Sequence, residues 1–233
     1  MRVIYALRDN PLRDARELRY SLRSLHKHGY ANAAVVCGAR PSWYVGRHVH
    51  ERDLLGAHQL NMTHKLGLAM NSSGPEVIWM CDDYFLLRPF DFRHHHGLPL
   101  RRTVENLQKT RHEREWTRRM MEETLQYLLD QGVKDPLNFV THTPFWMEKP
   151  AARQAMAICL TSKTGMELAT IYGNLYGNPH GRLFHEDVKL RRPDSRPKED
   201  WPSFSTDPSQ EDEPWTLDLL ERYYSSPSSC EKP

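Results

Sequence analysis

The sequence predicts an α/β fold: one domain built on a parallel, Rossmann-type sheet flanked by helices. Apolar, strand-like runs alternate with helical patterns over the first 87 residues, which is typical of a parallel sheet. A chain of 233 residues is long enough for one sizeable core, and it has no internal repeat. We expect the domain to cover residues 1–195, and an acidic tail with a docked helix to cover residues 196–233.

The elements of the first half follow from local patterns. Residues 3–7 read as a strand, which Asp9-Asn10-Pro11 ends. Apolar residues recur at helical spacing over 14–27, and Gly29 ends that helix. Residues 33–37 predict a second strand and residues 61–70 a second helix. The mostly apolar run 76–87 then predicts a buried strand that carries two adjacent carboxylates.

The second half is less regular. It predicts a helix over 113–129, a strand over 137–147, short helices over 150–160 and 165–175, and a final strand over 182–190. Proline, serine and acids dominate after residue 191, but the 215–223 segment has a helical pattern. Its apolar side chains, among them Trp215 and Leu220, predict that this helix packs back on the core.

Composition excludes several classes of protein. The net charge is only +2, so no global field selects a partner. The four cysteines are widely spaced without a Cys-x-x-Cys pair, which argues against a zinc site of that kind. The first residues read as a strand rather than a signal peptide, and no apolar stretch approaches a membrane span. We therefore expect a cytoplasmic protein without a membrane partner; the oligomeric state stays open.

The adjacent carboxylates Asp82 and Asp83 are the most informative feature. Burying both without partners is costly, and a divalent cation such as Mg²⁺ or Mn²⁺ would remove that cost. Paired aspartates after a strand often only open a turn or cap a helix. Here Phe85-Leu86-Leu87 continues the apolar pattern after the acids, which favours a metal site over a simple turn.

Four segments in order resemble a known family. Elements of the Stealth sugar-phosphate transferases are resembled by Arg16-Glu17-Leu18-Arg19-Tyr20-Ser21-Leu22-Arg23-Ser24-Leu25, Pro41-Ser42-Trp43, Cys81-Asp82-Asp83-Tyr84-Phe85 and His142-Thr143-Pro144-Phe145. The compact length looks more like short, GT-A-like glycosyltransferases of tailed phages, some of which modify hydroxymethylated pyrimidines in DNA. The resemblance implies a GT-A-like fold, a divalent cation, and a UDP-sugar or another nucleotide sugar as donor. One departure is Cys81, which stands at the first position of the usual Asp-x-Asp motif.

The resemblance also implies roles for single residues, each with a plainer alternative. Asp83 would bind the metal and Asp82 would assist. Lys65 would reach the diphosphate, although a solvated helix lysine is the competing interpretation. Asp9 would bind the nucleoside or cap a turn. His142 would be a metal ligand, a hydrogen-bond donor to phosphate or a general base, and a structural histidine is the plainer alternative. The full set of expected roles is catalytic Asp82, His142 and Asp187, donor-binding Arg8, Asp9, Lys65 and Lys189, and metal-binding Asp83 and His185, with His180 as the competing candidate for the role of His185.

A basic stretch suggests the acceptor. Residues 88–119 contain nine Lys or Arg against four Asp or Glu, whereas residues 199–233 contain two against nine. A charge run is often a solvated helix face. If the acceptor is double-stranded DNA with hydroxymethylated pyrimidines, its phosphates would meet this stretch. The residues concerned are Arg101, Arg102, Arg111, Arg114, Arg118 and Arg119.

Three functions stay open from the sequence. The first is a metal-dependent glycosyltransferase acting on 5-hydroxymethylcytosine in phage DNA, in the cytoplasm of an infected bacterium. The second is a Stealth-type transfer of a sugar phosphate to a glycan. The third is a non-catalytic nucleotide- or DNA-binding module, which the missing first aspartate keeps in view.

Overall fold

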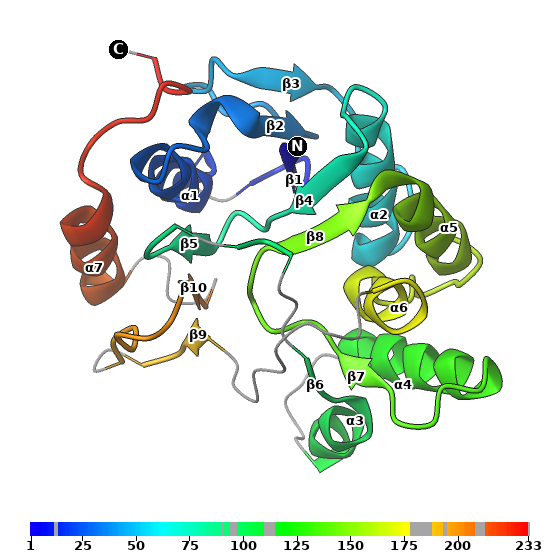
Figure 1. Ribbon diagram of the computed structural model, residues 1–233. Coiled ribbons are helices and arrows are strands. Elements are labelled where there is room, and N and C mark those ends of the chain that lie inside the picture. The colour runs from blue at the N-terminus through cyan, green and yellow to red at the C-terminus, as the bar shows by residue number, and fades with distance from the viewer. Residues whose placement is uncertain are drawn as a thin grey trace.

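The central feature of the fold is a five-stranded sheet. A computed structural model describes residues 1–11, 14–89, 91–93, 97–109, 115–177, 188–192, 195–207 and 213–232. The strand order is β3-β2-β1-β4-β8, from β3 (Arg47–Val49), β2 (Ala34–Cys37), β1 (Arg2–Ala6), β4 (Glu76–Trp79) and β8 (Phe145–Glu148). The first four are parallel and β8 is antiparallel to β4. The expected α/β domain with a parallel central sheet is therefore confirmed (Figure 1).

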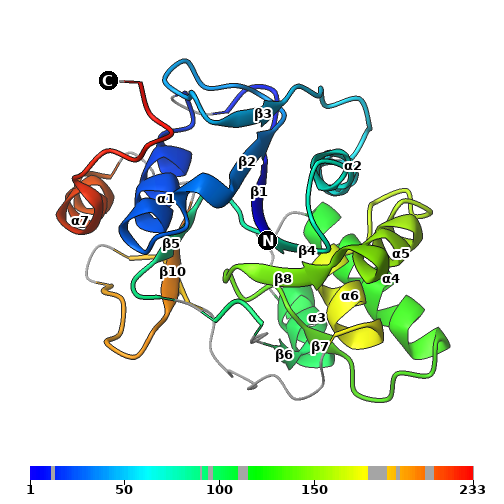
Figure 2. The same cartoon turned by 45° about the horizontal axis from the view of Figure 1, so that its top comes forward.

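Helices cover both faces of this sheet. Because side chains alternate along a strand, Val3 and Tyr5 join the core formed with α1 (Arg16–Lys27), whereas Ile4 joins the core formed with α2 (His58–Met70). Figure 2 shows α1 and α2 on opposite sides of β1. Two more helices, α5 (Lys149–Cys159) and α6 (Leu168–Leu175), lie on the same face of the sheet as α2 and pack against each other. In addition, α5 contacts β8 and α6 contacts α4.

A second, smaller sheet lies below α1. Its order is β5-β10-β9, from β5 (Tyr84–Leu86), β10 (Ser203–Thr206) and β9 (Lys189–Leu190). The helix α7 (Pro214–Tyr224) packs against α1, and its Tyr224 ring stacks with Phe85 of β5 and Phe204 of β10. Residues after α7 continue across α1 to the 43–45 segment, where Val45 donates to the carbonyl of Cys230. The C-terminal segment is thus part of the packed structure around α1.

The remaining elements form a flank beside α6. They are β6 (Leu98–Pro99), α3 (Leu100–Lys109), α4 (Glu115–Asp130) and β7 (Leu137–Asn138), with a short 3₁₀ turn η2 (Ala31–Ala33) elsewhere before β2. β6 pairs with β7, and α3 packs on α4. None of the helices in the described ranges has the length and apolar composition needed to cross a bilayer.

Two expected strands are in fact each divided. The run 76–87 splits into β4 of the central sheet and β5 of the small sheet, and Asp82 and Asp83 form a turn between them. The amide of Tyr84 donates to the carbonyl of Cys81 at 3.2 Å, which closes that turn. The expectation that the apolar residues after the acids argue against a turn is therefore wrong, because those residues belong to another sheet. One long buried strand and two strands buried in different sheets have the same apolar pattern. The run 137–147 splits in the same way into β7 and β8.

Candidate functional site

The carboxyl ends of β1, β2 and β4 meet at one edge of the sheet, which is where open parallel sheets bind ligands. Two groups of charged side chains lie at the strand ends there. We call Asp9, Asp53 and Lys65 the Lys65 cluster, and Asp82, Asp83 and Lys189 the Lys189 cluster. Each contains two carboxylates and one ammonium group, so their geometries decide which can serve a ligand.

Lys65 is buried inside the protein. Its side chain projects from α2 with no exposed surface, and its ammonium donates to the carbonyl of Leu7 at 2.6 Å and to Asp53 Oδ1 at 2.7 Å. A third, longer bond reaches Asp9 Oδ1 at 3.4 Å. Three partners match the three donors of an ammonium group. Lys65 is therefore neither the expected diphosphate ligand nor a solvated lysine, because its donors are used within the fold.

The two carboxylates of this cluster also bind each other's backbone. The amide of Asp9 donates to Asp53 Oδ2, and the amide of Asp53 donates to Asp9 Oδ2, both at 2.9 Å. The bond from the Asp53 amide is the main cause that lowers the pKa of Asp9. Asp53 was not among the expected site residues, since it lies in a loop without a local motif. This cluster closes the end of β1 against the loop that precedes α2.

A glycine is needed beside the same cluster. Gly38 follows β2 with φ +118°, and a Cβ placed on it would lie 2.1 Å from the carbonyl oxygen of Leu7. It would also lie 3.1 Å from the ammonium of Lys65. Any larger residue would separate the ends of β1 and β2. The tight approach at Gly38 is a second reason to regard the Lys65 cluster as structural.

The Lys189 cluster is assembled from distant segments. Asp83 is 8% exposed, and its Oδ2 accepts a hydrogen bond from the Ser205 hydroxyl at 2.8 Å. The same oxygen lies 3.7 Å from the ammonium of Lys189. Ser205 pairs with Lys189 between β10 and β9 and with Tyr84 between β10 and β5, so the small sheet brings them to the Asp82-Asp83 turn. The expected donor-binding Lys189 is thus next to the expected metal ligand.

The donor set of this cluster fits a hard divalent cation. Mg²⁺ at nucleotide sites uses one or two carboxylates together with substrate phosphates, rather than a cage made by the protein alone. Asp83 is such a carboxylate, and Asp82 precedes it in the same turn. Within the ranges that the structure describes, no three His, Cys, Asp or Glu side chains lie together as a metal cage. Burial, with Asp83 nearby, raises the pKa of Cys81, so its thiol stays protonated.

Two further expected residues lie at this edge. His142 precedes β8 with φ 55°, a strained conformation for a residue other than glycine, and its half-buried ring lies 6.2 Å from that of Tyr84. Because Phe145 pairs with Trp79, the residues before Phe145 extend towards the turn that follows β4. Arg8 is exposed at the end of β1. Asp187 and His185 fall outside the described residues, so their expected roles stay predictions.

The basic stretch is divided between two helices. Arg101 and Arg102 are exposed on α3. On α4, Arg118 pairs with Glu122 at 3.4 Å and Arg119 pairs with Glu115, each one helical turn away. This pairing offsets the charges of both arginines within α4 and is typical of a solvated helix face. Arg111 and Arg114 lie outside the described residues.

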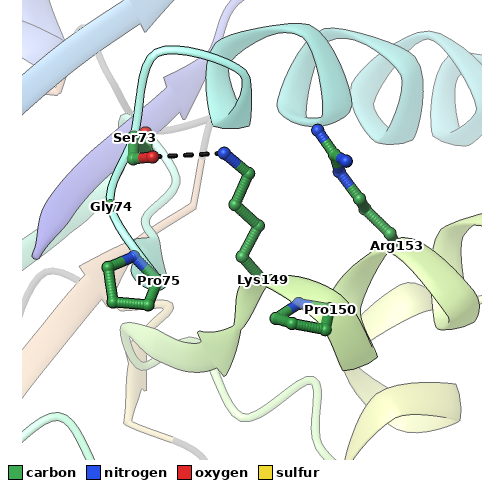
Figure 3. Close-up of a pocket in the computed structure, with 6 residues that line it drawn as sticks. All are labelled: Ser73, Gly74, Pro75, Lys149, Pro150 and Arg153. Carbon is green, nitrogen blue, oxygen red and sulfur yellow. Dashed lines mark hydrogen bonds between the residues drawn. The ribbon is translucent and has the colours of Figure 1, made fainter.

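A surface pocket of about 630 Å³ lies at the opposite edge of the sheet, directly before β4. Figure 3 shows Lys149 and Arg153 of α5 reaching across it towards the end of α2. Lys149 donates to the carbonyl of Ser73 at 3.1 Å, and Arg153 donates to Asn71 Oδ1 at 2.8 Å. Cations are favourable at a helix C-terminus, where carbonyl groups lack partners. This pocket is therefore explained by the packing of α5 on α2, away from both aspartate clusters.

Comparisons with known proteins give little beyond this geometry. No family model matches the chain, and no curated protein is significantly similar to it. Among solved structures, it is similar to the apo form of mouse xyloside xylosyltransferase 1, with a TM-score of 0.36 and 10% sequence identity. That match covers 99% of this chain and 95% of the xylosyltransferase chain.

Proposed function

We propose that the protein is a glycosyltransferase that moves a sugar from a nucleotide-sugar donor to a hydroxyl acceptor, with a divalent cation at Asp82 and Asp83. The observation that carries this proposal is the Lys189 cluster. Asp83, a nearly buried carboxylate, lies in the turn that follows a central parallel strand, next to a second aspartate in the chain and 3.7 Å from the ammonium of Lys189. Such a site favours a further cation, and a cation there favours a phosphate-bearing ligand.

The proposed chemistry assigns a step to each group. The acceptor oxygen attacks the anomeric carbon as the bond from that carbon to the diphosphate breaks, and the acceptor proton passes to a base, for which His142 is our candidate. A cation bound by Asp82 and Asp83 would neutralise charge on the leaving diphosphate. Ser205 orients Asp83 through its hydroxyl, and the Lys189 ammonium adds positive charge for the phosphates.

The acceptor that we favour is 5-hydroxymethylcytosine in double-stranded DNA. Arg101 and Arg102 on α3 support this choice, because they are exposed and would contact phosphates. The alternative is a Stealth-type transfer of a sugar phosphate to a glycan, which rests on the four resembling segments. The two reactions break different bonds, so the first releases a nucleoside diphosphate and the second a nucleoside monophosphate.

A donor screen tests the proposal. DNA containing hydroxymethylcytosine is incubated with the protein, nucleotide sugars and Mn²⁺. The DNA is then digested to nucleosides, whose masses are measured by mass spectrometry. A mass increment of one sugar, with release of a nucleoside diphosphate, is expected. Asp83→Asn should lower that turnover by about 100-fold or more while the circular dichroism spectrum stays unchanged. Full activity of this variant, or of the wild type in excess chelator, would remove the cation from the proposal.

A further inference from the structure

We propose that Trp43 is a positioning residue for Asp83 and that it acts through α1. Trp43 lies in the loop between β2 and β3, whereas Asp83 lies in the turn between β4 and β5. Trp43 holds the turn from which α1 begins, and α1 holds the segments around Asp83. The role of Asp83 as a metal ligand is taken from the proposed function, and this part alone rests on it.

One face of α1 holds the strand that follows the aspartate turn. Glu17, Ser21 and Ser24 follow one another at intervals of four and three residues, so they share a face of the helix, and all three are buried. The Ser21 hydroxyl donates to the carbonyl of Tyr84 at 2.5 Å. The Ser24 hydroxyl accepts from the amide of Leu86 at 3.0 Å. Both bonds reach β5, which packs against α1 (Figure 1), so α1 fixes one end of the aspartate turn.

The third side chain of this face is linked to Asp83 through β10. Glu17 Oε1 accepts a hydrogen bond from the Thr206 hydroxyl at 2.7 Å. The preceding residue of β10, Ser205, donates to Asp83 Oδ2 at 2.8 Å. Successive side chains of a strand point to opposite faces, so β10 binds α1 on one face and Asp83 on the other. The first turn of α1 is therefore connected to the carboxylate of Asp83.

The turn that begins α1 is strained. Asp14 and Ala15 have φ angles of 53° and 56°. Aspartate tolerates the left-handed region, but alanine does not adopt it without cost. Such a conformation persists only where surrounding contacts hold it. If the turn relaxed, the first helical turn would fray, and Glu17 would move away from β10.

Trp43 and its neighbour supply contacts that hold this turn. The buried indole N–H of Trp43 donates to the carbonyl of Asp14 at 2.7 Å. The Ser42 amide donates to Asp14 Oδ1 at 2.9 Å, and the Ser42 hydroxyl donates to Oδ2. The Arg19 guanidinium lies 4.8 Å from the centre of the Trp43 ring. Trp43 thus contacts both the strained turn and the helix that follows it.

The C-terminal segment fixes the loop that carries Trp43. The amide of Lys232 donates to the carbonyl of Trp43, and the amide of Val45 donates to the carbonyl of Cys230, both at 2.9 Å. Between these two bonds, Glu231 accepts two hydrogen bonds from Arg23 of α1, at 3.0 and 2.9 Å. The loop is therefore held between α1 and the C-terminal segment, so it can support a strained turn.

Removing one hydrogen bond of Trp43 tests the proposal. Trp43→Phe loses the bond to the Asp14 carbonyl but keeps an aromatic ring beside Arg19. Hydrogen exchange of the backbone amides of residues 82–86, measured by mass spectrometry without metal, should become about threefold faster or more. Mn²⁺ affinity, measured through the electron paramagnetic resonance of the free ion, should fall about fivefold, because fewer molecules hold Asp83 in place.

Relief of the strain separates positioning from general damage. Glycine adopts the left-handed region as readily as the right-handed one, so Ala15→Gly should make the turn less dependent on Trp43. Added to Trp43→Phe, it should return exchange and Mn²⁺ affinity to within about twofold of the wild type. Trp215→Phe is the matched control and should change neither, because within the ranges that the structure describes its indole N–H has no hydrogen-bond partner. If Trp43→Phe does not fold, Ser42→Ala replaces it with the same expectations.

The outcomes distinguish this proposal from the proposed function. Unchanged exchange at residues 82–86 in Trp43→Phe overturns the positioning role, and so does a loss that Ala15→Gly leaves uncorrected. If the wild type binds no Mn²⁺, or if Asp83→Asn binds it as tightly as the wild type, the cation of the proposed function fails. Exchange measured without metal still decides the role of Trp43 in that case. Faster exchange and weaker Mn²⁺ binding, both reversed by Ala15→Gly, support the two together.

Discussion

The Lys65 and Lys189 clusters have the same composition, two aspartates and a lysine, at the same edge of the sheet. In the Lys65 cluster the ammonium is fully buried and the carboxylates hold each other's backbone amides. In the Lys189 cluster the ammonium is farther from its carboxylate and sits on an edge strand. The comparison teaches that the same three residue types can be held in different ways: three described bonds hold the Lys65 ammonium, whereas a serine hydroxyl holds the carboxylate of Asp83 and the ammonium of Lys189 lies 3.7 Å from it.

The clusters also differ in the segments that support them. The Lys65 cluster is built from residues 7–65, whereas the Lys189 cluster needs β9 and β10 from beyond residue 188. Glu17 at the start of α1 accepts a hydrogen bond from Thr206 at 2.7 Å, so β10 is also tied to α1. The C-terminal region is therefore a structural part of the proposed site.

The largest effect is expected from a truncation that ends at Asp200. It removes β10 and α7, including the buried Phe204, Leu219, Leu220 and Tyr224. Each such side chain contributes about 1.5–3 kcal/mol when buried, so their loss approaches the whole stability of a typical domain. We expect the truncated chain to lose cooperative thermal unfolding, measured by circular dichroism. A melting temperature equal to that of the full chain would show that the tail is only a linker.

A smaller but still large effect separates the two lysines. Lys65→Met leaves two carboxylates and the Leu7 carbonyl without their buried partner and should reduce the free energy of unfolding by about 3–5 kcal/mol. Lys189→Met should cost less, because the Ser205 bond to Asp83 remains. Urea unfolding of both variants, beside Lys163→Met as a control that removes an exposed lysine after α5, measures the difference. Equal losses in the two variants would contradict a larger structural role for Lys65.

The pH dependence of stability sharpens the same comparison. The folded protein lowers the pKa of Asp9 from its ordinary value of 3.8, chiefly through the amide of Asp53. The stabilisation is present above that ordinary value and is lost as the pH falls through the lower, folded value. Between pH 5 and pH 2.5 the free energy of unfolding, measured with urea, should therefore fall more for the wild type than for Asp9→Asn. Parallel losses in the two proteins would contradict a stabilising charge on Asp9.

The smallest effect on stability is expected at the basic stretch. Reversing Arg101 and Arg102 to glutamate should lower affinity for duplex DNA and reduce the salt slope by about one unit for each lost phosphate contact. Reversing Arg118 and Arg119 should cost about 0.5 kcal/mol of helix stability per pair, because their partners are acids one turn away. Fluorescence anisotropy at several salt concentrations compares the two double variants. An unchanged affinity in both would favour a small or glycan acceptor.

Local patterns in the sequence determined the frame of the molecule. Segments whose apolar residues follow the spacing of a strand alternate with segments whose apolar residues follow the spacing of a helix. This alternation predicted β1, α1, β2, α2 and β4 in order, because the spacing reflects which face each element buries. Since parallel strands end at a common edge, the position of the Asp82-Asp83 pair after β4 followed from that frame. The helix expected near residue 215 also follows an apolar period, and it is present as α7.

Only the tertiary structure decided which charges meet. Asp9 and Asp53 are 44 residues apart, and Asp83 and Ser205 are 122 apart, so no local spacing connects them. A buried lysine has the same sequence signature as a solvated one, which is why Lys65 was expected at a ligand or in water. The break in the run 76–87 was equally hidden, since residues before and after it are buried in different sheets. Periodicity reports burial, whereas the partner of a buried charge depends on contacts between segments far apart in the chain.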